Sequence, residues 1–123
     1  MKFLIDTHIY LWALADRTKL APQRLDMLQT QANTIYVSSV TIAELMIKTS
    51  IGKIQIDFDP VQYAIESGFE MLDYTGQDAL KLKKLPFYHR DPFDRMLITQ
   101  AMSHNFPIMT DDKKIKLYDC QVL

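Results

Sequence analysis

The sequence predicts a single α/β domain with a mainly parallel central sheet of four to five strands, flanked by helices on both faces. Three observations support this prediction. Short apolar or β-rich runs alternate with helix-sized gaps, which is the pattern of repeated βαβ units. The 123 residues are enough for one domain with a real core. No internal repeat and no Gly-, Pro- or Ser-rich linker divides residues 1–123.

Five short runs are the candidate strands. They are Lys2–Ile5, Thr34–Ser38, Phe69–Leu72, Pro107–Thr110 and Cys120–Leu123. Strands that helices cover on both faces read as short apolar runs, as these do. The last of them is expected to form no more than an edge strand.

Six segments between these runs are the candidate helices. They are Thr7–Ala15, Pro22–Gln31, Val40–Ile51, Pro60–Ser67, Gly76–Lys84 and Pro92–His104. Ser39 is placed to cap the third helix. Asp59 and Asp91 each precede a proline, which puts an acid at the N-cap and proline at the first helical position.

The composition indicates a folded, soluble protein. Hydrophobic residues make up 48% of the chain and charged residues 24%, and the net charge of −1 supplies no overall basic field for nucleic acid. The single Cys120 can form no internal disulfide, which suits a reducing cytosol. Asp6 and His8 interrupt the apolar run that a signal peptide needs, and no apolar stretch is long enough to span a membrane. We therefore expect a cytoplasmic location.

Several carboxylates follow predicted strands. Open parallel sheets bind ligands at the carboxyl ends of their strands, and Asp6 lies at such an end. An aspartate there can equally cap the helix that follows. Asp111 and Asp112 come directly after the fourth run, where one of them can cap the next turn.

Glu44 is a carboxylate on an apolar helix face. Val40, Ile47 and Ile51 lie at positions that share its face. A buried carboxylate is costly unless it is paired or bound to a metal, so the position requires a partner. The alternative is an i,i+4 pair with Lys48, which is worth only about 0.2–0.5 kcal/mol.

Two more acids lie in the segment HRDPFDR. Asp91 is the predicted N-cap and is expected to be structural, whereas Asp94 then falls at the third helical position. Asp94 can merely complement the helix dipole there. Acids from four separate segments nevertheless favour one shared pocket. Oxygen ligands without a His or Cys cluster suit Mg²⁺ or Mn²⁺, which can activate water to hydrolyse a phosphodiester.

Four blocks of the sequence together resemble the PIN-domain nucleases, and most closely the VapC-type toxins of bacterial toxin–antitoxin pairs. They are FLIDTHIYLW, VSSVTIAELMIKTSIGKI, HRDPFDRMLITQA and IMTDDKKIKLY, in the family's order and across essentially the whole chain. HRDPFDR is the most telling of them. The resemblance places the catalytic, metal-binding acids at Asp6, Glu44, Asp94 and Asp112.

The resemblance also implies an activity and partners. The activity is a Mg²⁺- or Mn²⁺-dependent endoribonuclease in a PIN-like domain, and the partners are an antitoxin and a second copy of the chain in a homodimer. The fourth acid belongs to a Thr-x-Asp pattern that Thr110, Asp111 and Asp112 match. Because the middle position is itself acidic here, Asp111 could substitute for Asp112 or assist it.

RNA needs cations to hold its phosphates, and the acidic blocks contain several. Arg90, Arg95 and Lys113, with the neighbouring Lys114, are the candidates for substrate binding, although each can equally be a solvated charge. Arg95 is the first choice because it adjoins Asp94.

Aromatic side chains near the blocks are a further group of candidates. Phe87, Tyr88 and Phe93 can stack on bases, although core packing is the more common role. His8 and Trp12 lie one turn apart. His8 is expected to be structural, with substrate contact as the alternative, and Trp12 is expected on an apolar surface that an antitoxin could cover.

Two rival functions compete with a nuclease, and the sequence argues strongly against the first. A haloacid-dehalogenase-like phosphatase would use Asp6 as a nucleophile, but it requires a second aspartate where this chain has His8. The other rival is a non-catalytic module that binds RNA or an antitoxin and uses the acids as helix caps. The sequence does not identify the RNA target.

Overall fold

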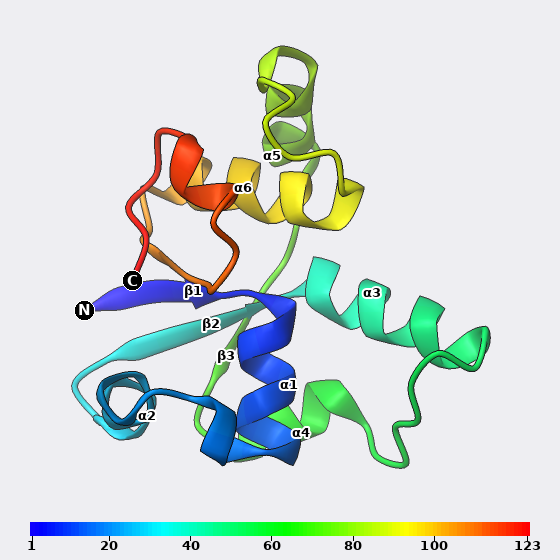
Figure 1. Ribbon diagram of the computed structural model, residues 1–123, viewed down its shortest axis with the longest axis vertical. Coiled ribbons are helices and arrows are strands. Elements are labelled where there is room, and N and C mark those ends of the chain that lie inside the picture. Colours follow the sequence, from blue (N-terminus) through cyan, green and yellow to red (C-terminus); the bar gives the residue numbers. More distant parts are fainter.

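A computed structural model describes residues 1–123 and contains one four-stranded sheet at its centre (Figure 1). The strands are β1 (Lys2–Ile5), β2 (Thr34–Ser38), β3 (Glu70–Leu72) and β4 (Ile108–Met109). All neighbouring pairs are parallel, in the order β3-β2-β1-β4. The carboxyl ends of the four strands therefore lie along one edge. This arrangement confirms the predicted α/β class and parallel sheet.

The fifth predicted strand is reduced to a single bridge. Ile108 pairs in parallel with Val122, held by hydrogen bonds from the Ile108 N–H to the Gln121 carbonyl and from the Leu123 N–H to the Ile108 carbonyl, each 2.9 Å. The C-terminal run thus extends the sheet edge beside β4 without forming a strand of its own.

Six α-helices connect the strands. They are α1 (Thr7–Ala15), α2 (Pro22–Gln29), α3 (Ser39–Ser50), α4 (Pro60–Glu66), α5 (Gly76–Leu80) and α6 (Pro92–His104). Short 3₁₀ helices cover Arg17–Lys19, Lys81–Lys84 and Ile115–Leu117. The predicted helix Gly76–Lys84 is therefore divided into α5 and a 3₁₀ turn, and the remaining predicted helices differ from the observed ones only at their ends.

The cap of α3 differs from the prediction by one residue. The Ser38 hydroxyl accepts the Val40 N–H at 3.0 Å and caps the helix. The predicted cap, Ser39, instead accepts the Tyr74 N–H at 2.9 Å. Ser39 thereby attaches the start of α3 to the chain that follows β3.

Apolar side chains pack on both faces of the sheet. Phe3 and Ile5 belong to a cluster with residues of α1, α3 and α4, whereas Leu4 belongs to a second cluster with residues of α6. Successive side chains of a strand point to opposite faces, which explains this division along β1. Figure 1 shows α1, α2 and α4 below the sheet and α5 and α6 above it. Helices cover both faces, as predicted.

No helix of the chain combines the length and the apolar composition that crossing a membrane requires.

Candidate active site

Asp6 lies between β1 and α1 and uses both of its carboxylate oxygens. Oδ1 accepts the Ile9 N–H at 2.8 Å and caps α1, and Oδ2 accepts the Thr110 hydroxyl at 2.5 Å. The side chain is buried. Burial raises the pKa of the Asp6 carboxyl above its usual value, although the hydrogen bonds from Thr110 and Ile9 oppose that shift. Asp6 therefore caps its helix and also belongs to a buried polar cluster.

Thr110 connects the ends of β1 and β4. Its buried hydroxyl donates to Asp6 and accepts the Asp112 N–H at 2.9 Å. The Asp112 carboxylate in turn accepts the Lys114 N–H at 2.8 Å. One hydroxyl thus sets the position of two acids that are far apart in the sequence.

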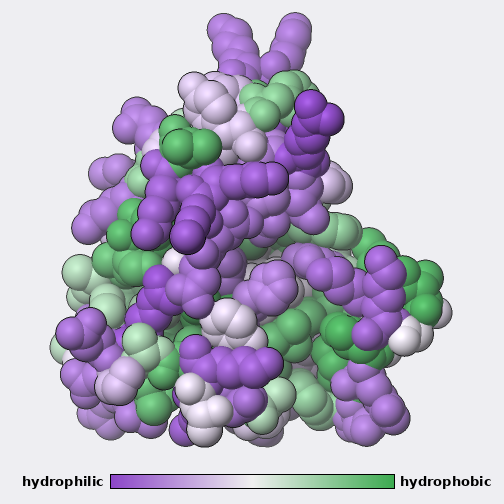
Figure 2. All heavy atoms as spheres, in the orientation of Figure 1, coloured by the Kyte–Doolittle hydropathy of each residue, from purple (hydrophilic) through white to green (hydrophobic).

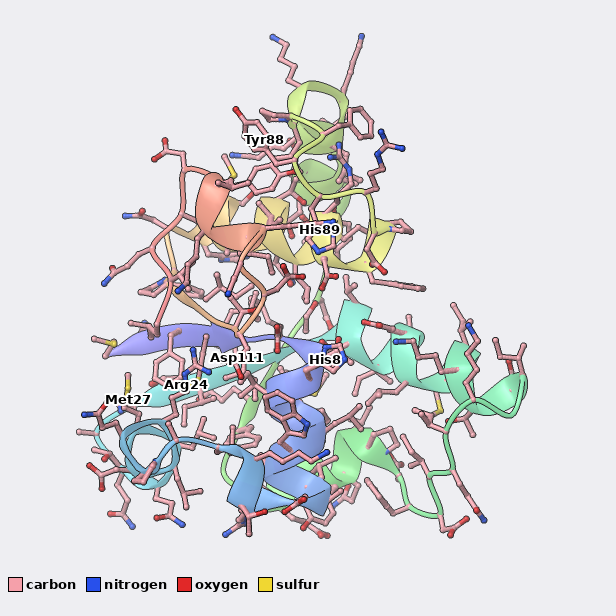
Figure 3. All side chains as sticks on the ribbon, viewed as in Figure 1. His8, Arg24, Met27, Tyr88, His89 and Asp111 are labelled. Atoms are coloured by element: carbon pink, nitrogen blue, oxygen red, sulfur yellow. The ribbon has the colours of Figure 1, made fainter.

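The two acids after β4 have different partners. Arg24 of α2 forms an ion pair with Asp111, and its Nη2 donates to the carbonyls of Thr110 at 2.8 Å and Leu123 at 2.9 Å. Figure 3 shows Arg24 and Asp111 close together beside the sheet, away from His89. Asp112 instead lies 2.6 Å from His89. This division favours Asp112 over Asp111 as the fourth acid of the cluster.

Glu44 is buried on α3, where only one of its two carboxylate oxygens has a partner. Lys48 Nζ lies 2.6 Å from Oε2, which is the predicted i,i+4 pair, but Oε1 is buried without any hydrogen-bond partner. An unsatisfied buried carboxylate oxygen is costly. The Thr7 and Thr41 hydroxyls, 3.1 Å apart, hold α1 against the same part of α3.

The predicted apolar face around Glu44 is wrong in its second half. Val40 is buried, but Ile47 and Ile51 are 48% and 61% exposed. Figure 1 shows that α3 extends beyond the end of the sheet, so the sheet does not cover its C-terminal part. Glu44 is buried because it lies on the part of α3 nearer to the strand ends.

The start of α6 follows the prediction closely. Asp91 is the N-cap and accepts the N–H groups of Phe93 at 2.9 Å and Asp94 at 3.1 Å, with Pro92 next to it. Asp94 is partly buried in the first turn.

Asp94 has the most strongly shifted pKa among the acids of the cluster. Burial raises the pKa of the Asp94 carboxyl to about 7, with repulsion from Asp91, Glu44 and Asp6 adding to the shift and His89 opposing it. Asp94 is therefore repelled by the N-cap of its own helix and by two acids from other segments, Glu44 and Asp6.

The sequence reasoning missed His89. Its buried imidazole Nε2 lies 2.6 Å from Asp112 Oδ2 and 3.2 Å from Asp94 Oδ2. Nδ1 accepts the Asp91 N–H at 3.1 Å, so Nε2 carries a hydrogen and donates to the carboxylates. Its position inside HRDPFDR, the most specific block, was the available signal.

Hydrogen bonding at His89 also acts on the pKa of Asp112. Burial by itself would raise this pKa, but hydrogen bonds from His89 and from the Lys114 N–H hold it below its usual value. Asp112 and Asp94 both contact the His89 imidazole, yet the pKa of Asp112 is lowered and that of Asp94 is raised.

The donor set of the cluster fits a hard divalent cation. Asp6, Glu44, Asp94 and Asp112 offer carboxylate oxygens, one of them buried and unpaired, and Mg²⁺ and Mn²⁺ prefer such ligands. One nitrogen of His89 and one carboxylate oxygen each of Asp94 and Asp112 lie within 4.8 Å of one another. A cation here would offset both the burial and the repulsion that raise the pKa of Asp94.

We expect Asp112→Asn and Asp111→Asn to differ in metal binding. Asp112→Asn should weaken Mn²⁺ binding by more than about tenfold, because even groups that only orient a metal's ligands contribute about 10- to 100-fold. Asp111→Asn should leave it nearly unchanged, because Arg24 already occupies that carboxylate. Titration with Mn²⁺ followed by electron paramagnetic resonance measures both. Equal losses of Mn²⁺ affinity in the two variants would mean that Asp111 and Asp112 share the role of the fourth acid.

The environment of Arg95 disfavours the predicted contact with substrate. Its guanidinium is buried and donates to the carbonyls of Leu85 at 3.1 Å, Pro86 at 2.9 Å and His89 at 3.1 Å. The loop before α6 therefore engages both terminal nitrogens of the Arg95 guanidinium. Arg90 and Lys113 are exposed, and their role stays a prediction.

Aromatic side chains lie in two places around the cluster. A cavity of about 290 Å³ is lined by the acids Asp6, Asp111 and Asp112 together with His8 and Trp12, whose ring centroids are 6.1 Å apart. His8 therefore borders the acidic cluster instead of being buried in the core.

On the other side, Phe87 and Tyr88 are exposed, whereas Phe93 packs against the second apolar cluster. Core packing is thus the role of Phe93 alone.

Comparisons with known proteins identify the family and the fold. The family model described as "PIN domain" matches residues 3–119. Among solved structures, VapBC2 from Rickettsia felis, bound to a DNA fragment from its promoter, has a TM-score of 0.75 at 20% identity, covering 100% of this chain and 98% of that one. VapBC-1 from nontypeable Haemophilus influenzae has a TM-score of 0.72 at 22% identity, covering 100% and 97%.

A more distant similarity is to the PIN domain endonuclease Utp24, with a TM-score of 0.51 at 20% identity, covering 94% of this chain and 74% of that one. No curated protein sequence matches the chain. At these identities the structural similarities establish the fold, and the family model extends over nearly the whole sequence. The chain belongs to the PIN-domain family.

Proposed function

We propose that this protein is a metal-dependent endoribonuclease, the VapC-type toxin of a toxin–antitoxin pair. The single observation that supports the proposal is that acids from four segments lie near one another. Thr110 links Asp6 to Asp112, and His89 links Asp112 to Asp94. Glu44, whose Oε1 is buried without a partner, repels Asp94. Helix capping explains Asp6 and Asp91, but it does not explain why Glu44 and Asp94 are buried near other acids. A shared metal explains both.

Each residue of the cluster has a defined part in the proposed mechanism. Asp6, Glu44, Asp94 and Asp112 would hold Mg²⁺ or Mn²⁺, which supplies an activated water and stabilises charge on the phosphate. Thr110 fixes Asp6 relative to Asp112, and His89 orients Asp112 and Asp94.

Outside the cluster, Arg90 and Lys113 are the exposed cations available to position the RNA backbone. Arg95 takes no part in this, because the loop before α6 encloses it.

The proposed partners follow from similar proteins. The Rickettsia felis and Haemophilus influenzae structures are VapBC proteins, and the Mycobacterium tuberculosis VapBC-5 structure belongs to a family of toxin–antitoxin systems. We extend this to an antitoxin partner for the present chain, and to a homodimer in the cytoplasm. A non-catalytic module of the same fold is the alternative function.

The test measures cleavage of a mixed RNA pool by the purified, antitoxin-free chain. We expect cleavage with Mg²⁺ or Mn²⁺ and none after EDTA, because the acids alone repel a phosphate. Binding of the pool without cleavage under any metal would favour the non-catalytic module. Cleavage that persists in EDTA would contradict the metal mechanism.

A further inference from the structure

The segment Lys81–Arg90, called here the 81–90 arm, projects from the body of the molecule next to the acidic cluster. It comprises the 3₁₀ helix after α5 and the loop that leads into α6, at the top of Figure 1. The segment contains four Lys and Arg residues and no Asp or Glu, in a chain whose net charge is −1. Over this part of the surface Figure 2 shows hydrophilic and hydrophobic atoms side by side.

Two adjacent aromatic side chains of the arm face solvent. Phe87 is 75% exposed and Tyr88 is 52% exposed. The next residue in the sequence, His89, is buried against Asp94 and Asp112. The two aromatic residues therefore directly precede a residue that contacts the acidic cluster. Figure 3 shows Tyr88 on the side away from the sheet and His89 on the side toward it.

The backbone under these aromatic rings is held rigidly. The buried Arg95 donates to three carbonyls of the loop, and its guanidinium lies 3.9 Å from the centroid of the Phe87 ring. Tyr118 Oη donates to the Pro86 carbonyl at 2.5 Å and accepts the His89 N–H at 2.8 Å. The Tyr88 ring packs edge-on against Tyr118, with centroids 5.1 Å apart. Buried polar groups thus fix a loop whose apolar rings stay in water.

We propose that Phe87 and Tyr88 form a stacking platform for the bases of single-stranded RNA, with Lys83, Lys84 and Arg90 contacting its phosphates. Proteins bind single strands through exposed aromatic rings that stack on the bases and through cations that contact the phosphate backbone. A paired helix keeps its bases stacked on each other and gains little from such rings. The proposal rests on the proposed nuclease function, since it names the part of the substrate held beside the acids.

The test combines binding and kinetics on the double variant Phe87→Ala, Tyr88→Ala. A 5′-fluorescein-labelled RNA of mixed sequence and about 12 nucleotides, close to the upper range of known single-strand sites, is the binding probe. In the Asp6→Asn background, where the probe stays intact, the double variant should weaken binding by about tenfold or more. In the active protein it should raise KM and leave kcat nearly unchanged, because the acids are untouched.

A matched control exists at the opposite end of the molecule. Phe58, which is 42% exposed, lies against the half-buried Tyr63 of α4, with ring centroids 5.2 Å apart. The double variant Phe58→Ala, Tyr63→Ala should bind the same RNA normally. Replacing Phe87 and Tyr88 by Trp should preserve affinity, because the rings remain, and circular dichroism melting confirms that each variant folds.

Lysine substitution tests the phosphate contacts separately. Lys83→Gln, Lys84→Gln should make RNA binding less salt-dependent, reducing the slope of log K against log salt by about 1.4 if both contacts are lost. An unchanged slope would overturn the assignment of these two cations.

The remaining outcomes separate the platform from the nuclease. Unchanged RNA affinity and KM in an active Phe87→Ala, Tyr88→Ala protein would overturn the platform and leave the nuclease standing. So would loss of dimerisation in light scattering with RNA affinity intact, which would make the pair an interface between copies. RNA that binds through the platform but is never cleaved would overturn the nuclease and support the platform.

Discussion

Replacing Asp6 by Asn is expected to reduce metal-dependent RNA cleavage by more than about a hundredfold, because groups that only orient a metal's ligands already contribute about 10- to 100-fold. Asp6 would be a ligand itself. The amide keeps the size of the side chain but loses the negative charge that binds the cation. Mn²⁺ affinity should fall together with activity, and calorimetric titration measures that loss without any RNA present.

The fold should survive this substitution. The Asn side-chain oxygen can still accept the Ile9 N–H, so the cap of α1 remains. The Thr110 hydroxyl, which now donates to Asp6, would instead accept the new amide hydrogen, leaving its own hydrogen without that partner. We therefore expect a small loss of stability, about 1 kcal/mol.

The control for Asp6→Asn is the same change at another helix start. Asp59 caps α4 through the N–H groups of Val61 and Gln62, far from the acidic cluster. Asp59→Asn should leave both cleavage and Mn²⁺ binding unchanged. Full cleavage activity in Asp6→Asn would disprove the proposed mechanism.

Replacing Asp94 by Asn is expected to have opposite effects on function and stability. It should abolish cleavage and weaken Mn²⁺ binding, yet stabilise the metal-free protein at pH 8. The reason is that the pKa of Asp94 is raised from 3.8 to about 7 by burial and by neighbouring acids. Above pH 7 the folded protein therefore contains a carboxylate ionised in an unfavourable place.

The size of this stability gain depends on pH. Between pH 4 and 7 the folded state holds a proton at Asp94 that the unfolded state has released, so this group's contribution to stability falls as the pH rises. The gain from Asp94→Asn should be absent near pH 4 and at least about 1 kcal/mol at pH 8. Thermal melts without metal at the two pH values measure it.

Metal binding should show the complementary dependence on pH. A cation must displace the Asp94 proton below pH 7, so Mn²⁺ affinity should fall by up to about tenfold per pH unit below that value and level off above it.

Asp78 provides the matched control for Asp94. It occupies the corresponding position in the first turn of α5, where it completes a capping box with Thr75. Asp78→Asn should retain activity and should not stabilise the protein, because this carboxylate has its hydrogen bonds. If Asp94→Asn lowered the stability of the metal-free protein at pH 8, the conclusion that the ionised Asp94 carboxylate destabilises the fold would be wrong.

The sequence predicted those features that depend on near neighbours. Asp91 at the N-cap and Asp94 in the first turn of α6 follow from the Asp-Pro pair, because capping bonds span only two or three residues. The parallel strands follow from short apolar runs separated by helices. The run at the C-terminus failed to form a strand, since only one of its residues pairs with β4.

Tertiary structure decided which charged groups share a partner. Ile47 was expected on a buried face, but α3 extends past the sheet and leaves it in water. Arg95 was expected at the substrate, but the carbonyls of the preceding loop surround it.

His89 was overlooked because its partner Asp112 is 23 residues away in the sequence, and Asp111 is engaged by Arg24 across 87 residues. Periodicity and capping are properties of a short segment and can be read from it. The environment of a carboxylate is set by segments that meet only after folding. The sequence could therefore identify the acids, but only the packed sheet edge determined which of them lie together.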